Sequence, residues 1–200
     1  MLDLMITDAA VLFPDGKVRG GQTVEVKDGI IKDVHPFGSE DLEKEAGERL
    51  SGSGKLLMPG LADCHMHTGQ QLLKGRVLDA LPMIWTRIML PFESTLTEEK
   101  MELSASLAAL EMIKSGTTAF VDAGSYHMEA AAEVYVRSGL RGLISASTMD
   151  EKGLPASIAQ NADEAVAQTD RLYDAYDGRG NLKVAYSLRS LISCSDKKNR

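Results

Sequence analysis

Cysteine is scarce in this sequence, which contains only Cys64 and Cys194 among its 200 residues. Two cysteines so far apart do not suggest the framework of a disulfide-stabilised secreted domain, and a reducing cytoplasm is the simpler compartment. The N-terminus has no basic segment leading into an apolar one, so no signal peptide is expected. These absences predict a cytoplasmic protein.

Long apolar runs and an excess of positive charge are also absent. No run approaches the ~20 apolar residues of a membrane-spanning helix. The formal net charge is −7 and the isoelectric point is near 5.1, so neither nucleic acid nor an anionic membrane is an expected partner. The contents of 44% hydrophobic and 26% charged residues are those of a globular protein.

Histidine is rare as well, yet two of the four histidines stand one residue apart, at His65 and His67. They follow Pro59-Gly60 and a strand-like apolar approach. Residues i and i+2 of a strand point to the same side, so the two imidazoles should project together. Such a pair at a strand end forms half of a metal site. Two partly exposed turn residues are the alternative, but the flanking sequence favours metal.

The first 55 residues read as short strands separated by turns. Pro14-Asp15-Gly16 and Asp28-Gly29 supply turn residues that preset or tolerate unusual φ angles. Residues 38–54 read as a connecting loop with one short strand, and His35 is expected to play a surface role. The expected strands lie at residues 4–6, 10–13, 23–27 and 30–34.

After His67 the pattern changes to alternating strands and helices, which is typical of βαβ units on a parallel sheet. Thr97 is a plausible N-cap for a helix that ends at Gly116. The apolar positions of this helix follow helical spacing: Leu103, Leu107, Leu110 and Ile113. Further helices are expected at 128–138 and 162–176, and further strands at 117–121, 142–148 and 182–188.

The histidine pair also carries a family resemblance. Pro59-Gly60-Leu61 followed by Asp63-x-His65-x-His67 resembles the first barrel strand of the amidohydrolase superfamily. The branch of aminohydrolases and chlorohydrolases, which includes cytosine, guanine and adenosyl-type deaminases and triazine hydrolases, is the most similar. The likeness continues through Gln71-Leu72-Leu73-Lys74-Gly75, Leu81-Pro82, Trp85, Leu96-Thr97-Glu98-Glu99, the run from Ser115 to Asp122, and Gly139-Leu140-Arg141.

The resemblance implies an α/β fold in two parts. Residues 1–55 would form part of a small β-sandwich domain, and residues 56–200 the first half of a (β/α)8 barrel. A complete barrel needs ~250 residues, whereas about four barrel strands are counted here, near Leu61, Phe120, Ile144 and Ala185. We therefore expect the N-terminal portion of the fold, either as a natural truncation or as an expression fragment.

The resemblance also implies a chemistry. His65 and His67 would bind a divalent metal, zinc or iron, which lowers the pKa of a bound water and supplies hydroxide. Attack on a ring carbon would deaminate an aromatic heterocycle, a reaction at a C–N bond other than a peptide bond. The family completes its site with two later histidines, an aspartate and a proton-shuttling glutamate, which this sequence lacks. No catalytic residue is therefore assigned, and the chain alone is expected to be inactive.

Several nearby residues receive lesser roles. His127 follows the second barrel strand and is expected at the rim of the site rather than on the metal. Asp63 and Asp122 are expected to be structural hydrogen-bond acceptors. Cys64 should be a small packing residue that points away from the histidines, and Cys194 an inert thiol.

The substrate, a small heterocyclic molecule, would meet residues that follow the strands. Gln70 and Gln71 offer hydrogen bonds to a heterocyclic edge, Trp85 offers a ring for stacking, and Arg189 offers a contact to an anionic or carbonyl-rich group. The alternative is that Trp85 packs a long loop and the glutamines are solvated; both interpretations remain open.

Two departures from nucleoside-type relatives concern the substrate. Those relatives carry an acid just before the tryptophan, where this chain has Ile84, and a Pro-His pair near Ser187–Ser190. Both departures speak against a ribose-bearing substrate and leave a free base, a pterin or a triazine-like ring.

A different class of function is a noncatalytic half-barrel. A parallel sheet with open edges invites association, and pairing with a second copy would cover them. The polar tail at residues 197–200 does not resemble the amphipathic helix that the family would place there. On this view the protein is a homo-oligomer.

Overall fold

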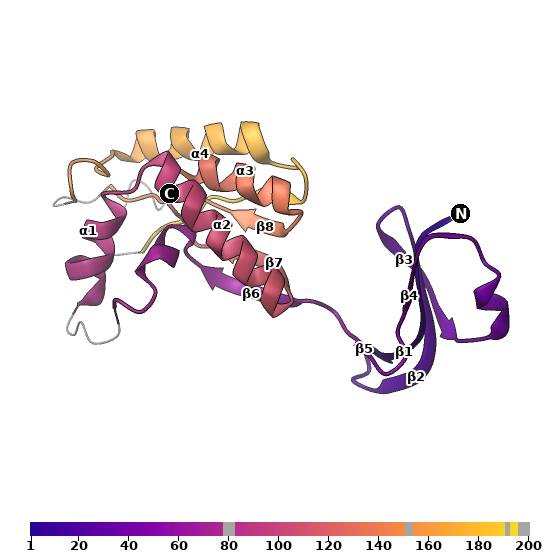
Figure 1. Cartoon of the computed structure of the whole chain (residues 1–200). Coiled ribbons are helices and arrows are strands. Elements are labelled where there is room, and N and C mark those ends of the chain that lie inside the picture. Colours follow the sequence, from indigo (N-terminus) through magenta and orange to yellow (C-terminus); the bar gives the residue numbers. More distant parts are fainter. Residues whose placement is uncertain (78–82, 151–153, 191–192, 196–200) are drawn as a thin grey trace. The chain divides into compact units, whose positions relative to one another are not determined.

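The computed structural model describes residues 1–77, 83–150, 154–190 and 193–195. The chain forms two compact units, Met1–Pro59 and Gly60–Arg200, which are considered separately below (Figure 1). Leu81-Pro82 and the polar tail at residues 197–200 lie outside the described residues. No helix in the described part of the chain is long and apolar enough to cross a membrane.

The first unit is a five-stranded sheet whose strand order is β3-β2-β1-β4, with β5 also paired to β1. β2 is antiparallel to both β1 and β3, whereas β4 and β5 run parallel to β1. Its elements are β1 Leu2–Leu12, β2 Val18–Lys27, β3 Ile30–Pro36, the 3-10 helix η1 Ser39–Leu42, β4 Ala46–Ser51 and β5 Leu56–Leu57.

Local chemistry explains the hairpin of this sheet. Asp28 and Gly29 both have positive φ angles, 54° and 70°, as the tight turn between β2 and β3 requires, so the predicted hairpin is confirmed. The predicted loop at residues 38–54 contains the expected short strand, β4, and in addition the short helix η1. β4 is largely exposed, so its residues lack the alternating pattern that announces a strand, and backbone pairing with β1 forms it instead.

The second unit is a four-stranded parallel sheet in the order β6-β7-β8-β9. Helices alternate with these strands, which confirms the predicted βαβ pattern and four barrel strands (Figure 1). Its elements are β6 Leu61–Met66, the 3-10 helix η2 Thr68–Leu73, the π-helix η3 Trp85–Met89, α1 Leu90–Glu93, α2 Glu98–Ser115, β7 Thr117–Asp122, α3 Met128–Ser138, β8 Arg141–Ile144, α4 Ala162–Tyr176 and β9 Leu182–Val184.

The helix ends follow the capping rules. Thr97 accepts a hydrogen bond from the Lys100 backbone N–H at the start of α2, and Gly116 ends this helix in the left-handed region at φ 79°. Gly139 ends α3 in the same way at φ 74°. α4 begins with a capping box in which the Asn161 side chain accepts from the Glu164 N–H and the Glu164 carboxylate accepts from the Asn161 N–H.

The leucine series that predicted helix α2 lies on the exposed face of that helix. Leu103, Leu107, Leu110 and Ile113 are 55%, 39%, 54% and 55% exposed. The buried face of α2 carries smaller residues instead, among them Met101, Ala105, Ala108, Ala109 and Met112. These side chains belong to one core cluster with Ala131, Ala132 and Tyr135 of α3.

Small residues decide which face is buried, because alanines on both helices let α2 and α3 approach closely while leucines would hold them apart.

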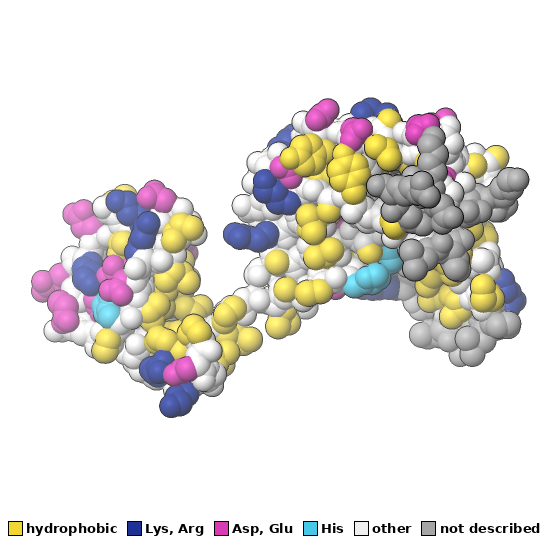
Figure 2. Space-filling view, turned by 180° about the vertical axis from the view of Figure 1, so that it is seen from behind, with side chains coloured by type: hydrophobic (Ala, Val, Ile, Leu, Met, Phe, Trp, Pro, Cys, Tyr) yellow, Lys and Arg dark blue, Asp and Glu magenta, His cyan; other side chains and the backbone are white. Residues whose placement is uncertain are grey.

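Further large apolar side chains are exposed on both units, including Ile30, Ile31, Leu56 and Leu61. Figure 2 shows groups of hydrophobic side chains on the visible surface of each unit.

The two faces of α2 should respond differently to substitution. Leu110→Gln is expected to change the free energy of unfolding by less than about 0.5 kcal/mol, as at other exposed sites. Met101→Ala, at a fully buried position, should cost about 2–5 kcal/mol because it leaves a cavity. Urea unfolding of both variants measures the difference, and equal losses would contradict this assignment of the buried face.

Candidate metal and substrate site

The two histidines of the predicted metal pair lie together at the carboxyl end of β6. His65 is near the end of the strand and His67 directly follows it, and their ring centroids are 5.1 Å apart at an interplanar angle of 90°. The rings therefore project toward a common region, as the spacing predicts. His65 is exposed and His67 is partly buried.

The hydrogen bonding of His67 is that of a metal ligand. Its Nδ1 lies 3.1 Å from the carbonyl oxygen of Gly124, which can only accept, so Nδ1–H donates and Nε2 keeps its lone pair. Burial, together with the nearby Arg189 guanidinium, lowers the pKa of His67 below its usual 6.5, which favours the neutral ring. A backbone carbonyl that orients the second ring nitrogen is the usual support of a metal-binding histidine.

Asp122 holds the loops on either side of this pair. Its buried carboxylate, at the end of β7, accepts hydrogen bonds from the backbone N–H and hydroxyl of Thr68, from the Gly124 N–H at 2.8 Å and from the Ser125 hydroxyl. Burial raises the pKa of Asp122, and the hydrogen bonds from Thr68 and Gly124 oppose that rise. The predicted structural role of Asp122 is thus observed.

Thr68 is fixed from further directions. Its hydroxyl oxygen lies 2.7 Å from the Tyr135 hydroxyl, and its carbonyl accepts from the Ser104 hydroxyl at 2.6 Å. Because Thr68 directly follows His67, α2 and α3 together determine where the histidine backbone lies. The sequence reasoning did not single out Thr68, Ser104 or Tyr135, since no local pattern links residues so far apart.

Two predicted substrate residues meet at a glutamate that the sequence reasoning missed. Arg189 donates to Glu93 Oε1 at 2.7 Å and to the Gly124 carbonyl at 2.8 Å, and Gln70 donates to Glu93 Oε1 at 2.6 Å. Both charged side chains are nearly fully buried, at 5% and 3% exposure. The Gly124 carbonyl therefore joins the arginine to His67. One feature of the sequence could have identified Glu93 as a candidate: it is an acidic residue that directly follows the apolar segment Leu90–Phe92.

The Glu93 carboxylate keeps one oxygen available. Glu93 Oε2 is buried and has no hydrogen-bond partner among the described residues. A buried carboxylate oxygen without a donor is costly unless a further group reaches it. This oxygen is therefore a candidate acceptor for a ligand N–H.

The remaining predicted residues lie away from the histidine pair or make other contacts. Trp85 is partly buried against the cluster of Leu90, Tyr126, Met149 and Ile158. His127 Nε2 lies 3.0 Å from the Leu96 carbonyl oxygen. His127 also lines a groove of about 860 Å³ among α2, α3 and α4, to which neither His65 nor His67 contributes.

The structure agrees with the roles predicted for Asp63 and Cys194, but not with the role predicted for Cys64. Asp63 accepts the backbone N–H of His65 at 3.1 Å, in line with a structural role. Cys194 is buried and donates to the Thr148 carbonyl. Cys64 is exposed, so its expected role as a packing residue is wrong; in the described part of the chain, β6 has a strand partner on only one side.

The histidine pair fits a divalent metal as two of its ligands. No third His, Cys, Asp or Glu among the described residues brings a ligand atom into a cluster with His65 and His67. Catalytic zinc sites commonly use three protein ligands and a water. The pair therefore offers two nitrogen atoms, one on the oriented imidazole of His67 and one on the exposed imidazole of His65.

The Glu93–Arg189 pair should be sensitive to loss of one partner. Arg189→Leu leaves a buried carboxylate with reduced compensation, and the free energy of unfolding should fall by about 3–5 kcal/mol. The double variant Glu93→Leu/Arg189→Leu should lose less than the sum of the single variants, which urea unfolding can measure.

The exposed pair Arg137–Glu102, with N–O distance 2.9 Å and side chains about 60% and 57% exposed, is the matched control. Its disruption should change stability little. Additive losses at Glu93 and Arg189 would show that these two charges do not depend on each other.

The sequence was compared with protein families and with known proteins. The model of the amidohydrolase family matches residues 56–197. The chain is 31% identical over 184 residues to the 5-methylthioadenosine/S-adenosylhomocysteine deaminase of Desulforamulus reducens, covering 90% of this chain and 41% of that protein.

Solved structures give the same picture. An adenosine deaminase from Xanthomonas campestris with bound zinc has a TM-score of 0.81 and 28% identity, covering 92% of this chain and 42% of that one. A guanine deaminase from C. acetobutylicum with bound guanine has a TM-score of 0.87 at 19% identity, covering 99% and 48%. The chain thus spans less than half the length of each of these proteins, and it belongs to the amidohydrolase family.

Proposed function

We propose that this chain supplies the first two histidine ligands of a metal-dependent deaminase acting on an amino-substituted aromatic heterocycle. The observation that carries the proposal is the His65–His67 pair at the end of the first barrel strand, with His67 oriented by the Gly124 carbonyl. Zinc is the proposed metal, since a zinc-bound adenosine deaminase shares the fold at 28% identity. A divalent ion held there lowers the pKa of a bound water toward neutrality.

The chain's own residues would prepare the site. Asp122 fixes the turn that begins at Thr68, and with it the position of the His67 ring. Arg189 and Gln70 hold Glu93 so that its Oε2 is left as an acceptor. An exocyclic amino group or a ring N–H is the kind of donor that such an oxygen accepts. Arg189 and Gln70 thereby act on the substrate through Glu93.

The class of heterocycle in the substrate is a separate part of the proposal. Ile84 stands where nucleoside-type relatives place an acid, which favours a free base, a pterin or a triazine-like ring. The names of the relatives include both nucleosides and the free base guanine, so these names do not distinguish between the two substrate classes.

The two free cysteines, Cys64 and Cys194, fit the proposed cytoplasmic setting.

Zinc content tests the metal half of this proposal. In a chimera that adds the part of the Desulforamulus reducens deaminase beyond this chain, His65→Ala/His67→Ala should retain about one zinc less than the unaltered sequence after dialysis against a limiting zinc buffer, measured by elemental analysis. His127→Ala is the matched control and should retain the same zinc as the unaltered chain. An equal zinc content in the double variant would remove the basis of the proposal.

Ammonia release tests the reaction. The 200-residue chain alone should not deaminate guanine or 5-methylthioadenosine, because two imidazoles are fewer ligands than a catalytic zinc needs. A chimera that adds the part of the Desulforamulus reducens deaminase beyond this chain should release ammonia from one of them.

In that chimera His67→Ala should reduce the rate by roughly 100-fold or more, since loss of even an outer partner of a metal ligand costs about 10–100-fold. Activity that survives unchanged in the His67→Ala chimera would contradict the assigned role.

A second candidate function rests on the exposed faces of the second unit. β6 is exposed along most of its length, and α2 carries the exposed series Leu103, Leu107, Leu110 and Ile113. A noncatalytic half-barrel that covers these surfaces with a second copy would be a homo-oligomer. Sedimentation across a concentration series should then show association that Leu107→Lys/Leu110→Lys weakens; a monomer at all concentrations would exclude it.

A further inference from the structure

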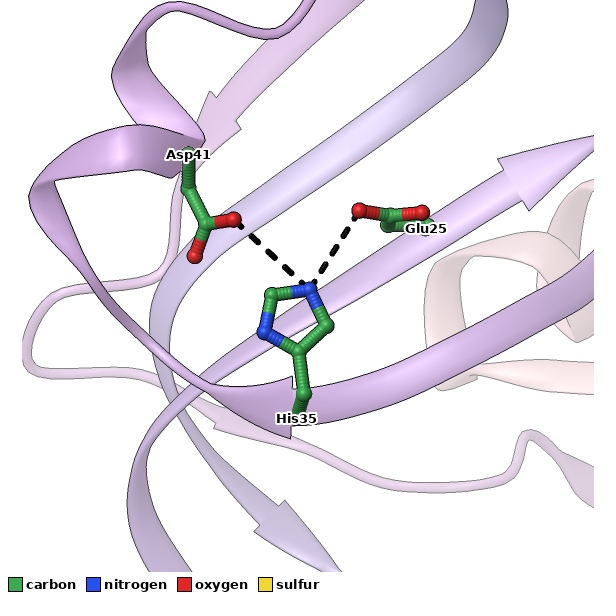
Figure 3. Close-up of side chains that lie close together, drawn as sticks. All are labelled: Glu25, His35 and Asp41. Atoms are coloured by element: carbon green, nitrogen blue, oxygen red, sulfur yellow. Dashed lines mark hydrogen bonds and ion pairs between the residues drawn. The ribbon is translucent and has the colours of Figure 1, made fainter.

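Three side chains of the first unit bring metal-ligand atoms to one point. Glu25 lies on β2, His35 on β3 and Asp41 in η1. Glu25 Oε1, His35 Nε2 and Asp41 Oδ1 all lie within 4.8 Å of one another. Figure 3 shows the two carboxylates directed toward the His35 ring. Thr23 is the cross-strand partner of His35, so Glu25, two residues along β2, shares its face of the sheet.

The histidine ring is oriented as a ligand. His35 Nδ1 lies 3.0 Å from the Pro36 carbonyl oxygen, which can only accept, so Nδ1–H donates and Nε2 is the ring nitrogen that faces the carboxylates. The Pro36 carbonyl, Glu25 and Asp41 raise the pKa of His35 above its usual 6.5, so a metal would bind in place of the proton on Nε2. That nitrogen lies 3.3 Å from Glu25 Oε1 and 3.7 Å from Asp41 Oδ1. The two carboxylates bring negative charge to this point, and a positive group beside them offsets their mutual repulsion.

The aspartate is fully buried and one of its oxygens is directed into the cluster. Asp41 Oδ2 accepts hydrogen bonds from the Thr23 hydroxyl at 2.8 Å and the Gly38 N–H at 3.1 Å. Asp41 Oδ1 accepts no hydrogen bond among the described residues; its close partner is the ammonium of Lys44, at 2.9 Å. Burial alone would raise the pKa of Asp41, but Lys44, Gly38 and Thr23 hold it at about 2, so the group is ionised.

Lys44 shows that the cluster binds a cation. Its Nζ lies 2.7 Å from Glu25 Oε1 as well as 2.9 Å from Asp41 Oδ1. The Lys44 side chain is 41% exposed, so it enters from solvent and can leave without disturbing the core. Nζ also lies 3.5 Å from His35 Nε2, so the ammonium faces all three ligand atoms. Imidazole nitrogen and carboxylate oxygen also bind divalent metals, so a metal ion suits the same place.

We propose that Glu25, His35 and Asp41 form a second divalent-cation site of the zinc class, in which Lys44 is the resident cation that the metal displaces. Imidazole nitrogen and carboxylate oxygen are both zinc ligands, and three protein ligands leave the fourth position to water. A bound ion would join β2, β3 and η1, and so would stabilise the first unit. This site is independent of His65 and His67.

Zinc titration of the full chain tests this site in a His65→Ala/His67→Ala background, so that the proposed barrel site does not contribute. Lys44→Ala should raise the zinc affinity by about tenfold or more, because a competing positive charge is removed from the ligand atoms. Lys27→Ala, which removes an equal charge from β2, is the matched control and should change the affinity little. Equal affinities for the two lysine variants would overturn the proposal.

Loss of a ligand should lower the zinc affinity, whereas loss of Lys44 should raise it. His35→Ala should weaken zinc binding by more than roughly 100-fold, a larger loss than that of an outer partner. Circular dichroism of the variant establishes that it is folded. In the unaltered His35 background, the ring nitrogen signals of His35 should move when zinc is added, which NMR detects without reference to stability. Ring signals of His35 that do not respond to saturating zinc would also overturn the proposal.

Discussion

The buried carboxylate of Asp122 is the interaction on which the histidine pair depends. It sits at the carboxyl end of β7 and accepts hydrogen bonds from the residue that follows His67 and from the loop that follows β7. A buried charge of this kind persists only where donors surround it. The same loop supplies the Gly124 carbonyl to His67 and to Arg189. One carboxylate therefore sets the geometry of the His67 ring and of the arginine that shares the Gly124 carbonyl.

The two proposed metal sites lie one in each unit of the chain. In the second unit, an imidazole is oriented by a backbone carbonyl, and further ligands are needed beyond the described residues. In the first unit, His35 is oriented by the Pro36 carbonyl in the same manner, but the carboxylates and a cation are already in place. The repeated arrangement reflects one rule: a ring nitrogen that donates to a carbonyl leaves the other free to bind a cation.

The exposed apolar face of α2 has the same physical origin as its buried face. Alanines at positions 105, 108 and 109 are buried against α3, which turns the leucines of the same helix outward. In the part of the chain that the structure describes, β6 and β9 each have one strand partner. Apolar side chains and unpaired strand edges are surfaces that proteins normally cover. A complementary half of the barrel or a second copy would meet that requirement.

Much of the fold followed from local sequence. The cap at Thr97, the glycines that end α2 and α3, and the Asp28-Gly29 hairpin are short-range features, and each was predictable because its hydrogen bonds join residues close in the chain. The strand before His65 and His67, and the common direction of their rings, followed from the two-residue period of a strand. The family resemblance followed from these motifs as well.

Only the tertiary structure decided the rest, because the contacts join residues far apart in sequence. Leucine spacing indicated that α2 is helical, but packing against the alanines of α3 decided which face is buried. Gln70 and Arg189 were visible as polar candidates, whereas Glu93, the partner that joins them, became apparent only when residues 23 and 96 positions away met it in space. The sequence predicted a surface role for His35, and only the structure shows that η1 places Asp41 beside it. The sequence thus determined the elements and the metal-binding residue types, and burial and long-range pairing decided which of them act together.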